Sequence, residues 1–326
     1  MKTFSIGFAG TDESEHEYAR QVAKLLGTDH HDRIIEIDAV HMADEIAGAL
    51  DEPNGDSSCL PTYLLSRFAR EHVTVALSGD GGDELFGGYR RYMDTIADVK
   101  NWNARLRTLV TGGRWWKPAD GYLSPRLLIF SPEDVARLMG GLPSAIEGLL
   151  DDWRRELNSS RLPLIHRMRT LDAATYLPGA VLAKVDRMSM RFSLEVRSPL
   201  LDRSVARFAE GLDAADCFGP PSTTKPLLKT LAERYLPAEH MQRPKMGFGL
   251  PSNSWSRDDM LALARETVAA PGGELGNHVD RAALRGLVER LGEPGRFSIY
   301  QVWPLLILEF WLAHRRAPSA PPAGGL

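Results

Sequence analysis

The chain has 326 residues, a formal net charge of −4 and a 43% share of hydrophobic residues, which are the proportions of an ordinary globular protein. It has no run of Lys and Arg and no basic stripe interleaved with aromatic residues, so nucleic-acid binding lacks its electrostatic footprint. The two cysteines, Cys59 and Cys217, lie outside any CxxC or His-containing metal spacing, so we expect reduced thiols in a cytoplasmic protein without a signal peptide.

The first hundred residues alternate between strand and helix patterns. The expected elements are, in order, a strand over 3–8, a helix over 14–26, a strand over 33–37, a helix over 41–50, a helix over 62–70 and a strand over 73–77. This β-α-β-α-α-β alternation is typical of a doubly wound parallel sheet, so we predict the α/β class.

Strand patterns disappear after about residue 95. Helices are expected over 132–139, 144–157, 171–185, 226–235, 258–269, 281–291 and 302–312. The last of these is apolar, but Pro304 and Glu309 interrupt it, and it is too short to span a bilayer, so we expect a buried core helix and no membrane partner. We therefore divide the chain into an α/β nucleotide-binding part (1–98), a mostly helical part (99–316) and a disordered Pro/Gly-rich tail (317–326).

The sequence Ser78-Gly-Asp-Gly-Gly-Asp-Glu84 is the most informative stretch of the chain. It follows the apolar run Val73–Leu77, which has the β-branched character of a buried parallel strand, and a helix is expected to begin near Glu84. In open α/β sheets, ligands bind at the carboxyl ends of the strands, and clustered carboxylates suit Mg²⁺. The alternative is an acidic, glycine-rich turn that only caps a helix.

Three blocks of sequence resemble the glutamine-hydrolysing asparagine synthase family, in its C-terminal synthetase domain of the ATP-pyrophosphatase type. They are Leu77-Ser-Gly-Asp-Gly-Gly-Asp-Glu-Leu-Phe-Gly-Gly-Tyr89, Lys184-Val-Asp-Arg-Met-Ser-Met-Arg-Phe-Ser-Leu-Glu-Val-Arg-Ser-Pro-Leu-Leu-Asp202, and Thr224-Lys-Pro-Leu-Leu-Lys229 with Arg243-Pro-Lys-Met-Gly-Phe248. The resemblance runs from about Lys2 to Ala313 and implies an adenine nucleotide α-hydrolase-like sheet.

The resemblance implies an asparagine synthase-like carbon–nitrogen ligase. Such an enzyme activates aspartate with ATP and Mg²⁺ as β-aspartyl-AMP, releases pyrophosphate, and lets ammonia attack the adenylate to give asparagine. The residues that match the family's site positions are Ser78 and Gly79 for AMP, Ile6 for adenine, Asp83 for Mg²⁺, Asp80 for the intermediate and ammonia attack, and Lys225 and Lys245 for pyrophosphate.

The substrate side is matched more loosely. Asp56 and Ser57 lie in a loop that resembles a substrate loop of the family, and Arg187 and Arg197 could orient the carboxylate and amine groups of the substrate. Each residue also has a structural alternative: Ile6 as plain core, the lysines as surface charges, the arginines in salt bridges, and the loop as an N-cap region.

Two family features do not occur in the chain. There is no Ser-Gly-Gly-x-Asp-Ser, the loop that cradles pyrophosphate after the first strand, and position 2 is Lys2 rather than the cysteine of the glutaminase domain. We therefore expect a partial sheet without its first strand, and an enzyme impaired when alone. The chain could be a fragment, half of a split enzyme or a decayed relative, so possible partners are a chain bearing the glutaminase or the missing loop, or a second copy.

Two alternative functions stay open at the level of sequence. The chain could amidate another carboxylate, on a saccharide or a peptide, because the same acids would serve and only the substrate loops would differ. It could also be a non-catalytic, complementing subunit of a split synthetase.

Overall fold

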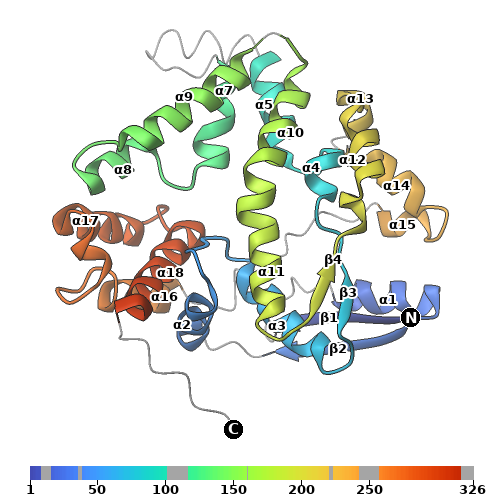
Figure 1. Ribbon diagram of the computed structural model, residues 1–326, viewed down its shortest axis with the longest axis horizontal. Helices are drawn as coiled ribbons and strands as arrows, with labels where there is room; N and C mark the ends of the chain where they lie inside the picture. The colour runs from blue at the N-terminus through green and yellow to red at the C-terminus, as the bar shows by residue number, and fades with distance from the viewer. Residues whose placement is uncertain are drawn as a thin grey trace.

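A computed structural model describes residues 1–8, 16–35, 39–100, 117–159, 161–219, 223–241 and 257–316 (Figure 1). Lys245 and the tail after residue 316 lie outside the described residues. The strands are β1 (Lys2–Phe8), β2 (Asp29–Ile35), β3 (Val75–Leu77), β4 (Glu195–Arg197), β5 (Phe218–Gly219) and β6 (Thr223–Thr224).

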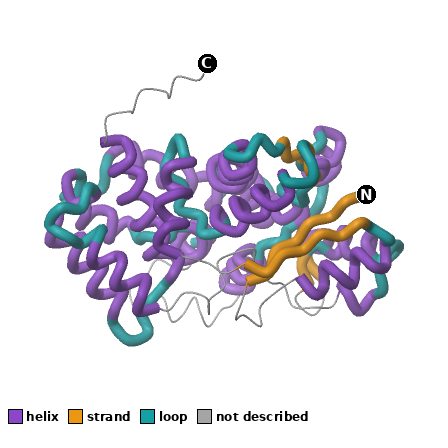
Figure 2. The backbone as a smooth tube through the Cα atoms, turned by 90° about the horizontal axis from the view of Figure 1, so that it is seen from below, coloured by secondary structure: helices purple, strands orange, loops and turns teal. Residues whose placement is uncertain are grey.

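Helices make up most of the rest (Figure 2). The α-helices of the first half are α1 (His16–Leu26), α2 (Ala39–Ala49), α3 (Cys59–Arg70), α4 (Gly82–Phe86), α5 (Arg90–Lys100), α7 (Pro118–Tyr122), α8 (Pro132–Met139) and α9 (Ser144–Asn158). Those of the second half are α10 (Leu164–Ala174), α11 (Ala183–Met190), α12 (Arg203–Glu210), α13 (Ala214–Cys217), α14 (Pro226–Ala232), α15 (Ala238–Met241), α16 (Arg257–Glu266), α17 (Arg281–Gly292) and α18 (Ile299–Arg316). Short π- or 3₁₀-segments are η1 (Leu123–Leu127), η2 (Leu177–Leu182), η3 (Pro199–Leu201) and η4 (Leu275–Asn277).

The parallel strands form two pairs. β1 pairs with β2 from Lys2↔Asp29 to Phe8↔Ile35, and β3 pairs with β4 from Val75↔Glu195 to Leu77↔Arg197. Within the described residues the two pairs share no strand–strand hydrogen bonding, and β5 and β6 form a separate antiparallel pair. The α/β class is confirmed, whereas a continuous doubly wound sheet stays a prediction.

Two expectations about strands were wrong. β3 is not buried, because the side chains of Val75 and Leu77 are 42% and 69% exposed. The strand signal does not end near residue 95 either, since β4 follows a helix as the parallel partner of β3. β4 was not predicted because two of its three residues, Glu195 and Arg197, are charged and form no apolar run.

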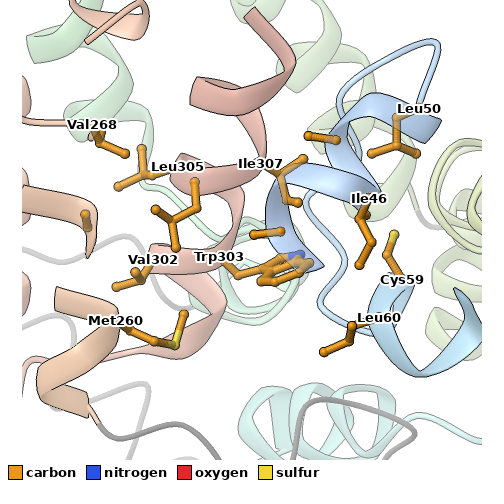
Figure 3. Packing of buried hydrophobic residues seen from close by; sticks show 14 of the residues in the cluster. Ile46, Leu50, Cys59, Leu60, Met260, Val268, Val302, Trp303, Leu305 and Ile307 are labelled. Carbon is orange, nitrogen blue, oxygen red and sulfur yellow. The ribbon is translucent and has the colours of Figure 1, made fainter. Parts of the chain in front are cut away.

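The larger core joins the beginning and the end of the chain. α18 packs on α2, and Trp303 and Ile307 of α18 lie near Ile46 of α2 (Figure 3). Trp303, Leu306 and Ile307 are fully buried, as expected of an apolar segment over 302–312. The domain division at residue 98 stays a prediction. None of the described helices is long and apolar enough to cross a membrane.

A second core underlies the acidic motif. It contains Phe86 of α4, Tyr92 of α5, Met168 of α10 and Cys217 of α13, all buried. The helix expected over 171–185 is interrupted, because α10 ends at Ala174 and the π-segment η2, with Pro178 in its first turn, precedes α11. Proline lacks the N–H that a continuous α-helix requires, which explains the break.

Candidate active site

The carboxyl ends of β3 and β4 bring together two segments that are 120 residues apart. The backbone N–H of Ser78 donates to the Arg197 carbonyl at 2.9 Å and so continues the β3–β4 ladder by one residue. The Ser78 hydroxyl donates to Asp80 Oδ2 at 2.6 Å and lies 3.1 Å from the Ser198 hydroxyl. Ser78 and Asp80 are thus placed at a strand end, where α/β folds bind ligands, and Ser198 is a polar neighbour that the sequence did not single out.

The glycines of the motif allow close packing around α4. Gly81, before the helix, has φ +86°, and a Cβ there would lie 2.2 Å from Leu201 Cδ2. Gly87, after the helix, has φ +72°, and a Cβ there would lie 2.6 Å from Cys217 Cβ. Only glycine adopts such a φ without strain and leaves such a gap open. The helix begins at Gly82, two residues before the predicted start at Glu84.

Asp83 and Lys225 form an ion pair across the site, with 2.6 Å between Lys225 Nζ and Asp83 Oδ1. Both side chains are about one-quarter exposed, so a ligand can reach them. Lys225 has φ +54°, although it carries a side chain and precedes Pro226, and this conformation is one that strained functional residues adopt. The structure thereby unites two of the residues predicted to handle phosphate and metal.

The donor atoms around Asp83 bear on the expected magnesium site. Within the described ranges, no group of three or more His, Cys, Asp and Glu side chains could hold a metal ion. Mg²⁺, however, is commonly bound by one or two carboxylates together with phosphate oxygens and water. Asp83 fits that role as a single protein ligand, because its carboxylate is partly exposed and faces a lysine suited to phosphate.

Glu84 points into the protein instead. It is 2% exposed and accepts a hydrogen bond of 2.5 Å from the Tyr89 hydroxyl. Burial raises the pKa of Glu84 above its usual value, although the bond from Tyr89 acts in the opposite direction. The adjacent acids thus divide into a buried anchor, Glu84, and an accessible carboxylate, Asp83.

A buried carboxylate also stabilises the region around Glu84. Asp172 of α10 is fully buried and accepts hydrogen bonds from Arg91, Tyr92 and Tyr122 at 2.5–2.6 Å. The Arg91 guanidinium also lies 3.8 Å from the ring centroid of Tyr89, which donates to Glu84. Sequence reasoning missed this hub, and its signal was the Tyr89-Arg90-Arg91-Tyr92 run at the end of the first motif.

A second polar cluster forms around the Asp56 loop. Lys184 of α11, 8% exposed, donates to Asp56 Oδ2 at 3.0 Å and to the Ser58 hydroxyl at 2.5 Å. Burial acts to raise the pKa of Asp56, but the charge of Lys184 and the bonds from Ser58 outweigh it and hold that pKa below its usual value. Lys184 was missed as a site residue although it opens the second sequence block.

Tyr176 packs beside the acidic motif, with 5.8 Å between its ring centroid and that of Tyr89 and the Arg91 guanidinium 4.8 Å from its ring. Its pKa is raised by burial and by the negative charges of Asp56 and Glu84, and lowered by Arg91. Asp56 and Glu84 therefore both lie within electrostatic range of a single phenol group.

The side chains of the remaining predicted residues do not join the acidic motif, although the Arg197 backbone lies beside Ser78 and Ser57 belongs to the Asp56 loop. Ile6 is 8% exposed within the larger core, and Ser57 is buried at 4% exposure. Arg187 pairs with Asp51 at 2.7 Å, while Arg197 donates to Glu195 at 2.8 Å on the surface. These four residues are not joined to Asp80 or Asp83 by any side-chain hydrogen bond recorded within the described ranges. Gly79 adjoins Ser78 and has open space around its Cα.

Comparisons with known proteins identify the family of the chain. The asparagine synthase family model matches residues 1–313. The chain is 30% identical to a putative glutamine-hydrolysing asparagine synthetase of Mycobacterium bovis, over 95% of this chain and 50% of that protein. It is 28% identical to glutamine-hydrolysing asparagine synthetase 1 of Bacillus subtilis, over 95% of this chain and 52% of that protein.

A third relative matches a shorter stretch: a putative asparagine synthetase of Methanocaldococcus jannaschii is 45% identical over 95 residues, which cover 29% of this chain and 18% of that protein. The chain spans about half the length of the relatives that it matches throughout. With a family model that covers residues 1–313 and relatives aligned over 95% of its length, the chain belongs to the asparagine synthase family.

Proposed function

We propose that this chain is the synthetase part of an ATP-dependent amide ligase that converts aspartate and ammonia into asparagine. The observation that carries the proposal is the arrangement at the ends of β3 and β4. There the Ser78–Asp80 turn lies beside Ser198, and the next helix presents Asp83 to Lys225. Family membership makes an amide ligase the expected class of enzyme.

The reaction requires two displacements. First, a carboxylate oxygen of aspartate attacks the α-phosphorus of ATP, the bond between the α- and β-phosphates breaks, and pyrophosphate leaves. Then ammonia attacks the carbonyl carbon, gives up a proton, and AMP leaves with the bridging oxygen. Both displacements develop negative charge on phosphate oxygens, which fixed cations and hydrogen-bond donors stabilise.

Each residue has a role in this scheme. Ser78 and Gly79 contact the AMP phosphate, and Lys225 with Lys245 neutralises pyrophosphate as point charges. Asp80, oriented by the Ser78 hydroxyl, receives the proton that the attacking ammonia loses. Asp83 would hold Mg²⁺, which would supply charge neutralisation for the triphosphate.

The substrate side is assigned to the second polar cluster. Asp56, Ser57 and the adjoining Lys184 would recognise the charged ends of aspartate, with Arg187 and Arg197 at the periphery and Ile6 behind the adenine. Support comes from the Lys184–Asp56 pair, which places a buried cation and a carboxylate together in this loop. Exchanging aspartate for uronate or peptide carboxylates in the assay would reveal a different acceptor.

We further propose that the site is completed by a strand between the two parallel pairs. Within the described part of the chain, β1 and β3 each have one strand partner. The apolar Val75 and Leu77 of β3 are exposed, which is unusual for a strand that carries site residues at its end. A strand bearing a Ser-Gly-Gly-x-Asp-Ser loop would join both pairs into one parallel sheet, and it could come from the same polypeptide or from a partner chain.

The proposal is tested by pyrophosphate release with ATP, Mg²⁺, aspartate and ammonium. The chain alone is expected to release little, whereas addition of a strand–helix segment carrying Ser-Gly-Gly-x-Asp-Ser should give aspartate-dependent release. Asp83→Ala should abolish that release without changing the far-ultraviolet circular dichroism. Release that is independent of aspartate, or unaffected by Asp83→Ala, would contradict the proposal.

A further inference from the structure

One buried arginine binds the acidic turn through its backbone. Arg169 of α10 is 6% exposed and donates to the carbonyls of Glu84, at 3.3 Å, and of Leu85. Its guanidinium also donates to the carbonyls of Ala209, at 2.5 Å, and Leu212, at 3.0 Å. A single side chain therefore ties α4 to the end of α12.

The turn that Arg169 holds has little stability of its own. α4 has five residues, and helices of that length do not persist without tertiary contacts. The last carbonyls of a helix lack partners within the helix, and a cation placed among them is favourable. Arginine suits this place because its planar fork presents five donors in fixed directions, whereas lysine presents one compact ammonium group.

Arg169 also lies where the turn meets the segment that carries Lys225. Cys217 contacts Gly87 at the end of α4, and its carbonyl accepts a 3.1 Å hydrogen bond from the Lys225 backbone N–H. Arg169 is close enough to Cys217 to lower the pKa of that thiol, although burial raises it more. The helix that carries Asp83 and the Cys217 residue that binds the Lys225 backbone therefore both contact the Arg169 guanidinium.

We propose that Arg169 is a positioning residue that fixes the turn Gly82–Phe86 and so sets the place of Asp83 opposite Lys225. Arg169 reaches no reacting atom, because its recorded partners are carbonyls and a thiol behind the turn. The geometric part of this inference is independent of the reaction. Its consequence for Mg²⁺ rests on the proposed function.

The chain offers a matched control on the same helix. Arg167 is 9% exposed and donates to a single carbonyl, that of Leu157 in α9. Two residues along an α-helix differ by about 200° in direction, so Arg167 faces away from α4. Arg167→Lys and Arg169→Lys both keep the charge and remove the fork, but only the second releases the acidic turn.

The experiment compares hydrogen exchange of the amides of residues 82–88 in the two full-length variants and the unmodified chain. In Arg169→Lys these amides should exchange about tenfold faster, the effect of losing one charge-assisted hydrogen bond. In Arg167→Lys they should be unchanged. Equal exchange in the two variants would overturn the inference.

A second measurement needs no variant, and so decides the question even if Arg169→Lys does not fold. In native-state exchange of the unmodified chain at low denaturant, the amides of α4 should open together with those of α10. Opening of α4 well before α10 would overturn the inference.

The Mg²⁺ requirement separates positioning from general stability. In the strand-complemented pyrophosphate assay, Arg169→Lys should raise the half-saturating Mg²⁺ concentration several-fold, while Arg167→Lys leaves it unchanged at a similar melting temperature. If the unmodified protein showed no Mg²⁺-dependent release, the proposed function would fail, and the exchange data would still decide whether Arg169 holds the turn.

Discussion

Replacement of Gly87 by alanine should destabilise the protein more than an equivalent replacement elsewhere. Gly87 and Gly140 both cap the ends of helices, α4 and α8, with φ of +72° and +70°. A new Cβ at Gly87 would lie 2.6 Å from Cys217 Cβ and 3.4 Å from its Cα, whereas nothing lies within 4 Å of a Cβ at Gly140. Both substitutions therefore introduce the same backbone strain, but only the one at Gly87 also brings a steric clash with Cys217.

The magnitudes follow from these two contributions. An L-residue in the left-handed region costs about 1–2 kcal/mol at either site. Overpacking against the buried Cys217 adds about 1–3 kcal/mol at Gly87 alone. Replacing glycine by alanine lowers the conformational entropy of the unfolded chain by the same amount in both variants, so this contribution cancels in the comparison. Gly87→Ala should thus lose about 2–5 kcal/mol and Gly140→Ala about 1–2 kcal/mol of the free energy of unfolding.

Urea unfolding monitored by tryptophan fluorescence measures both losses. Cys217→Gly removes the colliding Cβ, so in that background the penalty of Gly87→Ala should fall to that of Gly140→Ala. Equal losses for the two alanine variants in the unmodified background would refute the packing of α4 described above.

Three further predictions concern side chains around the site. Asp172→Asn should lower the free energy of unfolding, measured by urea titration, by about 3 kcal/mol, because Arg91 would remain buried without its counter-charge. A loss below about 1 kcal/mol would contradict a stabilising role of the buried Asp172 carboxylate. The pKa of Asp56 is lowered in the folded state, so the folded state binds fewer protons than the unfolded state. The stability that the Asp56 carboxylate contributes is therefore present above the ordinary aspartate pKa and is lost as pH falls through the pKa of Asp56 in the folded protein. Melting temperatures of the unmodified protein and Asp56→Asn should converge as pH falls below 4, and parallel curves would be inconsistent with the shift. Leu77→Thr should change the melting temperature of the isolated chain by less than about 3 °C, since this side chain is 69% exposed, but should cost more once the proposed strand is bound.

The sequence predicted those parts of the fold that local patterns determine. The strand β1, the helix α8 and the buried α18 follow from apolar periodicity, proline and caps, and each is confirmed within the described residues. The second strand was placed too late, because β2 begins at Asp29, four residues before the predicted start. Strand β4 was missed because its partner β3 lies 120 residues earlier, and only that pairing makes Glu195–Arg197 a strand. No local pattern encodes such a contact.

The candidate site divides in the same way. The motif predicted Ser78, Asp80 and Asp83 as neighbours at a strand end, and the structure places them there, although their chemical roles stay predictions. The roles of Arg169 and of Lys184, which opens the second sequence block, could not be inferred from local sequence, because a buried cation is recognised by the carbonyls or carboxylate around it. Those partners come from distant helices and loops.

In the proposed reaction a carboxylate of aspartate becomes joined to AMP at this site. Aspartate labelled with ¹⁸O in its side-chain carboxylate tests it directly, in the strand-complemented protein with ATP, Mg²⁺ and ammonium. We expect one ¹⁸O atom in the AMP released, because the bridging oxygen leaves with AMP when ammonia attacks. Unlabelled AMP, or label in inorganic phosphate together with formation of ADP, would contradict it.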